Sequence, residues 1–342
     1  MTAKPSPWPQ VAGIVALLTV IVSVLLTAFA WPAVRSSVHD VPIAVAGPAA
    51  ATGQVTAALN ERQPGAFDVV QVAGTAEAEA AIRDREVYGA IDLSGGGPQV
   101  LTASAASPVV AQTLQGVANA LAHASDPAAA QGGAAAGTVV VRDVVAAPAD
   151  DPRGAGMAAA ALPIVLGGIV AAGLLTLRIT GVGRRVAGAL GFAVAGALAM
   201  AAILQFWLGA LSGDYFANAG VLALGTAAIS LTILGLESLL GPAGLGIGAA
   251  TMMLLGNPLA GVSTAPEMLP GWSGAFGQLL PPGAAGSLLR SVAFFDGAGA
   301  GSSIVVLSTW LAAGAALCVI SVVRARRRAT IPAEEPATMV PA

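Results

Sequence analysis

The stretch PSPWPQVAGIVALLTVIVSVLLTAFAWPAV, residues 5–34, contains no charged side chain. Five further apolar stretches follow between Gly154 and Val323. Each is long enough to cross a bilayer as a helix, which takes roughly 20 residues. The composition agrees, because 56% of the 342 residues are hydrophobic and only 10% are charged. A soluble domain of this length does not bury so much apolar surface, so the sequence predicts an integral membrane protein.

The apolar stretches predict an α-helical polytopic membrane protein with six transmembrane helices. We expect these helices at residues 11–31, 156–177, 186–208, 217–236, 244–262 and 303–323. An α/β domain outside the cytoplasm, residues 35–153, is inserted between the first and second helices. Residues 1–34 form a cytoplasmic tip and the first helix, and residues 154–323 form a five-helix domain with an outer hairpin at 263–302. Residues 324–342 form a cytoplasmic tail, basic and then disordered.

The basic residues predict the orientation in the membrane, since they are favoured in short cytoplasmic loops. With both termini inside, eight of the fifteen basic residues lie in short cytoplasmic segments: Lys4, Arg178, Arg184, Arg185, Arg324, Arg326, Arg327 and Arg328. The opposite orientation violates the bias at two separate places. We therefore expect a multi-pass protein of the cell membrane with both termini cytoplasmic.

The first apolar stretch has a second interpretation as a secretory signal, because Ala28-Phe29-Ala30 loosely matches a cleavage site. A signal's apolar core is about 7 to 15 residues long, and this one is nearer to 20 residues. We therefore favour an uncleaved anchor. Either interpretation exports the segment that follows.

The exported segment shows the changes of hydrophobic period that are typical of a layered α/β domain. Short β-rich runs stand at residues 41–46, 67–72, 88–93, 99–102 and 139–145, and helical patterns at 52–61, 108–122 and from Thr75 onward. The glycine-rich turn at 94–98 joins two strands, and residues 128–137 are expected to form a mobile loop. The predicted order is βαβαββαβ. The chain's one cysteine, Cys318, lies in the last apolar stretch, so no disulfide staples this domain.

Motifs of catalytic chemistry are not found in the sequence. The two histidines, His39 and His123, are far apart, and there is no HExxH, GxSxG or CxxC pattern. A phosphate-binding P-loop is excluded because Lys4 is the sole lysine. We therefore expect no enzymatic activity, no cofactor and no metal site, and any energy for work must come from another chain. The net charge of −3, without a basic face, argues against nucleic-acid binding.

Three polar or glycine features fall within the apolar stretches. Residues 244–249, GLGIGA, formally match a dinucleotide-binding pattern, but no strand precedes them. We interpret Gly244 and Gly248 as a GxxxG helix-packing face. Gln205 is the strongly polar side chain at membrane depth, and either joins two helices by a hydrogen bond or contacts a transported substrate. Glu237 is expected to have an ordinary role at a helix end.

The outer hairpin, residues 263–302, is rich in proline and aromatic residues. Residues 286–295 predict a short helix that either lies in the outer interface, with Arg290 reaching lipid head groups, or packs on the exported domain. Both interpretations place the hairpin at the outer face.

Several runs resemble a known family. Residues 257–261 (NPLAG), 266–270 (PEMLP) and 279–284 (LLPPGA) resemble the outer hairpin before the last helix of type-2 ABC exporter permeases, near the bacterial phage-infection-protein group. Residues 80–82 (AAI) leading to 88–91 (YGAI) resemble the exported segment of the same proteins.

The resemblance implies a permease subunit that forms a homodimer or heterodimer and binds a separate ATP-binding cassette subunit. It implies that the loop with Arg178, Arg184 and Arg185 couples to that subunit. The first hypothesis is therefore an exporter of a hydrophobic or amphipathic substrate, with membrane lipid as its surroundings. The alternative is a membrane-anchored scaffold or binding protein that presents its exported domain and transports nothing.

Overall fold

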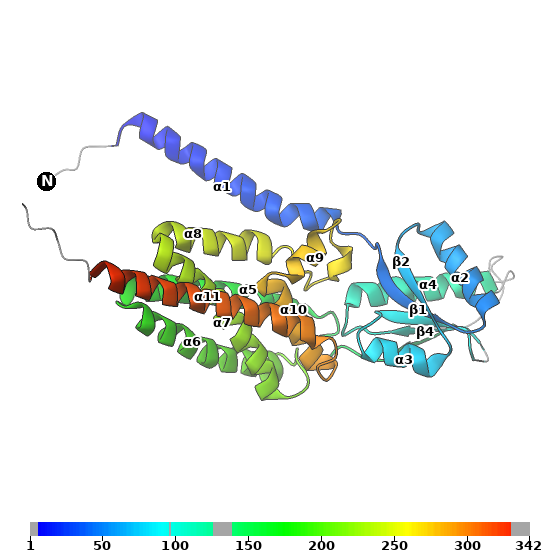
Figure 1. Ribbon diagram of the computed structural model, residues 1–342. Helices are drawn as coiled ribbons and strands as arrows, with labels where there is room; N and C mark the ends of the chain where they lie inside the picture. The colour runs from blue at the N-terminus through cyan, green and yellow to red at the C-terminus, as the bar shows by residue number, and fades with distance from the viewer. Residues whose placement is uncertain (1–5, 96, 126–138, 330–342) are drawn as a thin grey trace, which may run out of the picture.

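An α/β unit and a bundle of apolar helices lie end to end in the molecule, with the short helices α9 (Ser273–Gln278) and α10 (Pro281–Phe294) at the junction (Figure 1). The computed structural model describes residues 6–95, 97–125 and 139–329. The expected loop at 128–137, Lys4 and the end of the expected tail, 330–342, lie outside the described residues.

The α/β unit contains a five-stranded sheet of order β2-β1-β3-β4-β5. Its strands are β1 (Val41–Ala46), β2 (Phe67–Val72), β3 (Gly89–Asp92), β4 (Gln99–Thr102) and β5 (Val140–Asp143). Strands β2, β1 and β3 are parallel, β4 is antiparallel to β3, and β5 is parallel to β4. The order of strands and helices predicted from the sequence, βαβαββαβ, is confirmed.

Helices cover both faces of this sheet. They are α2 (Ala49–Arg62), α3 (Thr75–Arg83) and α4 (Pro108–Ser125). Alternate residues of β1 point to opposite faces, so Ile43 packs in one core with Leu114 of α4, and Ala44 packs in the other with Ile82 of α3. The unit therefore has two separate small cores, one on each side of the sheet.

Within the described residues, five helices are long and apolar enough to cross a membrane. They are α1 (Trp8–Arg35), α5 (Ala155–Arg178), α6 with its π-helical end (Val182–Trp207), α7 (Tyr215–Leu240) and α11 (Ala300–Ala329). These helices are consistent with a polytopic helical membrane protein. Helix α1 stands apart from the others, and none of its most apolar 18-residue window is buried (Figure 1).

Helix α7 is the centre of the bundle, with 78% of its apolar window buried. It begins where the Asp214 carboxylate accepts a hydrogen bond from the amide of Ala217 (2.7 Å), a normal N-cap. Its close contact with α11 requires glycine on both helices. A Cβ at Gly235 would lie 2.6 Å from the carbonyl oxygen of Gly314, so any larger residue there would separate the two helices.

The fifth expected span is shorter than the sequence predicted. Helix α8 (Pro242–Ala250) continues as a π-helical segment (Thr251–Gly256), and the combined apolar helix ends at Gly256 rather than at residue 262. Pro258, just beyond, has no amide hydrogen to continue a helical ladder. At 15 residues, Pro242–Gly256 is below the length that spans a bilayer unaided.

The hairpin at 263–302 folds into a 3₁₀ turn (Pro266–Met268) and two helices, α9 (Ser273–Gln278) and α10 (Pro281–Phe294). Helix α10 packs against α7 and α11 and is buried along most of its length. The expectation that Arg290 reaches lipid head groups is wrong, because its side chain is only 4% exposed. The sequence could not reveal that α10 is enclosed by its neighbours.

Candidate functional site

The junction between the α/β unit and the helices contains an unusual group of buried polar side chains. Arg85 lies between α3 and β3 and adopts a left-handed backbone (φ 62°). Its Nη1 donates to the carbonyl oxygen of Ser287 (3.0 Å) and to Oγ of Ser291, and its guanidinium lies 5.4 Å from the centre of the Phe295 ring. Arg85 thus joins the α/β unit to α10 by hydrogen bonds and a cation–π contact.

Backbone strain gathers at the same place. Among the described residues, the non-glycine residues with positive φ are Asp40, Arg85 and Asp296. Asp40 precedes β1, Arg85 precedes β3 and Asp296 follows α10. Each costs of the order of 1 kcal/mol or more, and such strain persists only where surrounding contacts hold it in place. The junction is therefore a specifically built contact.

A second link across the junction is formed by Tyr88 and Glu267. The Tyr88 hydroxyl donates to Oε2 of Glu267 (2.8 Å). Burial, together with the neighbouring Glu267 carboxylate, raises the pKa of Tyr88 far above its ordinary value. Tyr88 is therefore a neutral donor at any physiological pH, and Glu267 is its acceptor.

Arg290 is the least satisfied group at the junction. Its Nη2 donates to the carbonyl oxygen of Val262 (2.7 Å), but its buried Nε has no hydrogen-bond partner. Among the described residues, no carboxylate oxygen lies within 4.0 Å of the guanidinium nitrogens of Arg85 or Arg290. Glu267 acts on both arginines only as a longer-range charge.

Two of the cavities that open at this junction are lined by these arginines. The larger, of about 530 Å³, is lined by Arg85, Tyr88 and Glu267 among others. The smaller, of about 200 Å³, is lined by Arg290, Arg153, Asp151, Ser263, Met157 and Phe294 among others, and we call it the Arg290 cavity. Charged groups that converge on a partly apolar cavity are typical of a ligand site.

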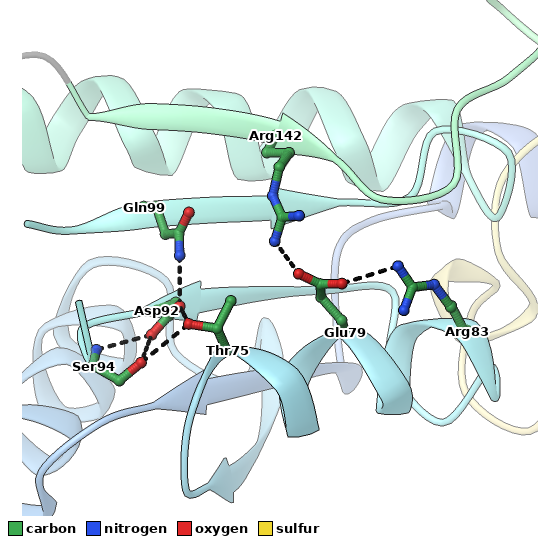
Figure 2. Close-up of polar contacts among 7 residues, drawn as sticks. All are labelled: Thr75, Glu79, Arg83, Asp92, Ser94, Gln99 and Arg142. Carbon is green, nitrogen blue, oxygen red and sulfur yellow. Dashed lines mark hydrogen bonds and ion pairs between the residues drawn. The ribbon is translucent and has the colours of Figure 1, made fainter.

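A different polar cluster lies within the α/β unit, at the carboxyl ends of its parallel strands (Figure 2). The buried Asp92 carboxylate ends β3 and accepts four hydrogen bonds: from the amide of Ser94 (2.8 Å), from its hydroxyl, from the hydroxyl of Thr75 and from Nε2 of Gln99 (2.7 Å). Burial alone would raise the pKa of Asp92, but these bonds outweigh it and lower the pKa below its ordinary value.

The Asp92 cluster lies at a position where open α/β sheets often bind ligands, since the strand order reverses between β1 and β3. Here, however, each Asp92 oxygen already accepts two bonds from the protein. Nearby, Glu79 of α3 forms ion pairs with Arg83 and Arg142, and the Arg142 bond is the main cause of its lowered pKa (Figure 2). These groups join α3 to the sheet.

The predicted coupling loop divides into two kinds of arginine. Arg185 pairs with Glu237 at the end of α7 (2.9 Å) and donates to the carbonyl oxygens of Ile179 and Thr176 (2.8 and 3.2 Å). Arg178 and Arg184 are exposed. Arg185 therefore fixes the loop to the bundle, and the other two remain accessible to a partner.

The remaining predicted site residues lie within the bundle. Gln205 donates to the carbonyl oxygen of Gly213 (2.9 Å) and accepts from Nδ2 of Asn218 (3.1 Å), so it joins the end of α6 to the start of α7. Gly244 and Gly248 are buried against α7, where a Cβ at Gly244 would lie 2.1 Å from the carbonyl oxygen of Leu236.

Arg85 and Asn218 belong to no motif predicted from the sequence, and Glu267 had no predicted role. Arg85 and Ser291 are 206 residues apart, and no local pattern links them. Within the described residues, no group of three or more metal-ligating side chains is found. Comparison of the chain with protein-family models, with curated proteins and with solved structures finds no match.

Proposed function

We propose that this chain is the membrane permease subunit of an ABC-type exporter, which moves a hydrophobic or amphipathic substrate with ATP hydrolysed by a separate subunit. The observation that carries the proposal is the polarity of the bundle. Arg178, Arg184 and Arg185 lie at one end of it, beside the carboxyl ends of α7 and α11, and the α/β unit occupies the other end (Figure 1).

This polarity supports a cytoplasmic location for the arginine-rich end, since basic short loops are retained inside. The α/β unit would then stand outside the cell membrane, with Pro242–Gly256 as a sixth, shorter pass. The exposed Arg178 and Arg184 would face a cytoplasmic ATP-binding subunit. Two permease copies would complete the transport path.

The junction supports transmission of movement between the two ends. Helix α10 packs against α7 and α11 and is bonded to Arg85 of the α/β unit. A displacement of α7 driven from the loop at 178–185 would therefore reach the α/β unit through α10. The alternative, a scaffold that only presents the α/β unit, needs no such connection.

The test is the double variant Arg178→Gln/Arg184→Gln, which keeps the Arg185–Glu237 pair. We expect the wild-type chain, purified from membranes of its native host, to retain a subunit with a GxxxxGK[ST] motif, identified by mass spectrometry. The double variant should lose at least about nine-tenths of that subunit, because two charge-assisted contacts are removed.

The matched control is Arg35→Gln/Arg62→Gln, which removes the same charge at the other end and should leave the recovery unchanged. Orientation is checked by replacing the exposed Glu61 with cysteine, since the native Cys318 is buried. Labelling of that cysteine by an impermeant maleimide in intact cells is expected. Labelling only after lysis, or no ATP-binding subunit in the wild-type preparation, would overturn the proposal.

A further inference from the structure

We infer that the Arg290 cavity binds an anionic group, a phosphate or a carboxylate, carried by a small or amphipathic molecule. Arg290 is the residue that points to this ligand. Its side chain is 96% buried, it has no carboxylate within 4.0 Å among the described residues, and its Nε donates to no atom. A buried guanidinium with neither counter-ion nor full hydrogen bonding is expensive to keep.

Among the described residues, no carboxylate around the cavity forms a direct ion pair with Arg290. Asp151 also lines the cavity, but its two oxygens accept from the amides of Ala155 and Gly156 (2.7 and 2.8 Å). Its carboxylate therefore neutralises the start of α5, as an acidic N-terminal cap does. Glu267 is bonded to Tyr88 and shared between two arginines.

The cavity wall contains a second cation, Arg153, besides Arg290. Arg153 stands exposed at its rim, and Ser263 contributes a hydroxyl donor. Arg290 and Arg153 both line the cavity, and guanidinium groups are the side chains best suited to bind phosphate or carboxylate.

The size and lining of the cavity define the ligand class. A volume of about 200 Å³ accepts an acidic head group but not a long chain. Met157 and Phe294 make part of the wall apolar, which suits a molecule with an apolar portion next to its charge. If this molecule is the exported substrate, that role rests on the proposed function. Its binding in the Arg290 cavity does not depend on the proposed function.

The experiment measures equilibrium binding to the full chain in phosphatidylcholine nanodiscs, with empty nanodiscs as the blank. The probes are radiolabelled inorganic phosphate, dihexanoyl phosphatidic acid and, as the zwitterionic comparison, dihexanoyl phosphatidylcholine. We expect saturable binding of an anionic probe and none of the zwitterionic one. Binding of phosphate identifies a free anion as sufficient, and binding of phosphatidic acid alone identifies an amphipathic ligand.

Arg290→Gln should weaken this binding by about 10- to 100-fold, since it removes hydrogen bonds between charged groups. Arg153→Gln, at an exposed position that does not disturb the core, should weaken it several-fold. Arg62→Gln, an exposed arginine elsewhere on the α/β unit, is the matched control and should bind as the wild type does. If Arg290→Gln does not fold, Arg153→Gln decides alone.

Failure of both anionic probes to bind, or wild-type affinity in Arg153→Gln and in a folded Arg290→Gln, would overturn the inference. The assay contains no ATP-binding subunit and no transport step. A chain that retains its ATP-binding subunit but binds no anion therefore contradicts only this inference, and the reverse result contradicts only the proposed function.

Discussion

The Asp92 cluster and the Arg290 cavity are both built around a buried charge, yet they differ in how that charge is satisfied. Asp92 accepts four hydrogen bonds from groups on three neighbouring segments of one small unit. Arg290 makes one hydrogen bond and leaves its Nε without a partner. The first arrangement is complete in the chain alone, and the second is not.

The difference separates structural from functional polar groups. A fully bonded buried charge stabilises the fold and has no capacity left for a ligand. An incompletely bonded one keeps donors for a molecule from outside, at a cost to the stability of the empty protein. The Asp92 cluster lies where open α/β sheets often bind ligands, but its bonding assigns it to the fold.

The largest effect that would test this comparison is expected from Asp92→Ala. The substitution leaves the Thr75 hydroxyl, the Gln99 amide and the Ser94 amide without their acceptor in a buried place. The α/β unit should lose about 3 kcal/mol of local stability. Hydrogen exchange of the β3 amides in the full chain, which reports the free energy of local opening, measures this loss. Unchanged exchange would contradict the structural role.

The matched control is Asp92→Asn, and it adds a pH test. The pKa of Asp92 is lowered in the folded unit, so its carboxylate contributes stability that is fully present above the unfolded pKa of about 4. That contribution is lost as the pH falls from about 4 through the lowered folded pKa. Protection of β3 in Asp92→Asn should therefore fall less steeply below pH 4 than in the wild type.

The fold could be predicted from the sequence to a larger extent than the site. Charge-free stretches and short β-rich runs are local patterns, and they place the long helices and the five strands correctly. The burial of Arg290 depends on how α10 packs against α7 and α11, which no local pattern encodes. The same holds for Arg185, whose partner Glu237 is 52 residues away.

A smaller effect is expected at the junction from Tyr88→Phe. The hydroxyl is the neutral donor to Glu267, and its loss should weaken the docking of the α/β unit by about 1.5–2 kcal/mol, as for a hydrogen bond to a charged acceptor. Faster hydrogen exchange at the start of β3 measures the change. The control is Tyr215→Phe, which removes a bond to the carbonyl oxygen of Leu198 within the bundle and should leave β3 unaffected. Equal exchange in both variants would mean that the Tyr88–Glu267 link does not hold the junction.

The smallest effect is expected from Glu79→Gln, and it sharpens the comparison because Glu79 carries the same charge as Asp92 in the same unit. Its partners Arg83 and Arg142 are 59% and 45% exposed, so water and salt screen both pairs. Exposed ion pairs of this kind contribute about 0.2–1 kcal/mol. The free energy of local opening measured by hydrogen exchange of α3 should change by no more than that, with a still smaller change at 1 M salt.

Glu77→Gln, on the same helix, tests a carboxylate that accepts from the amide of Ala73 instead of from arginine. If Glu79→Gln were as damaging as Asp92→Ala, burial and complete hydrogen bonding would not distinguish the Asp92 cluster from an exposed ion pair. The incomplete hydrogen bonding of Arg290 would then no longer indicate a ligand site.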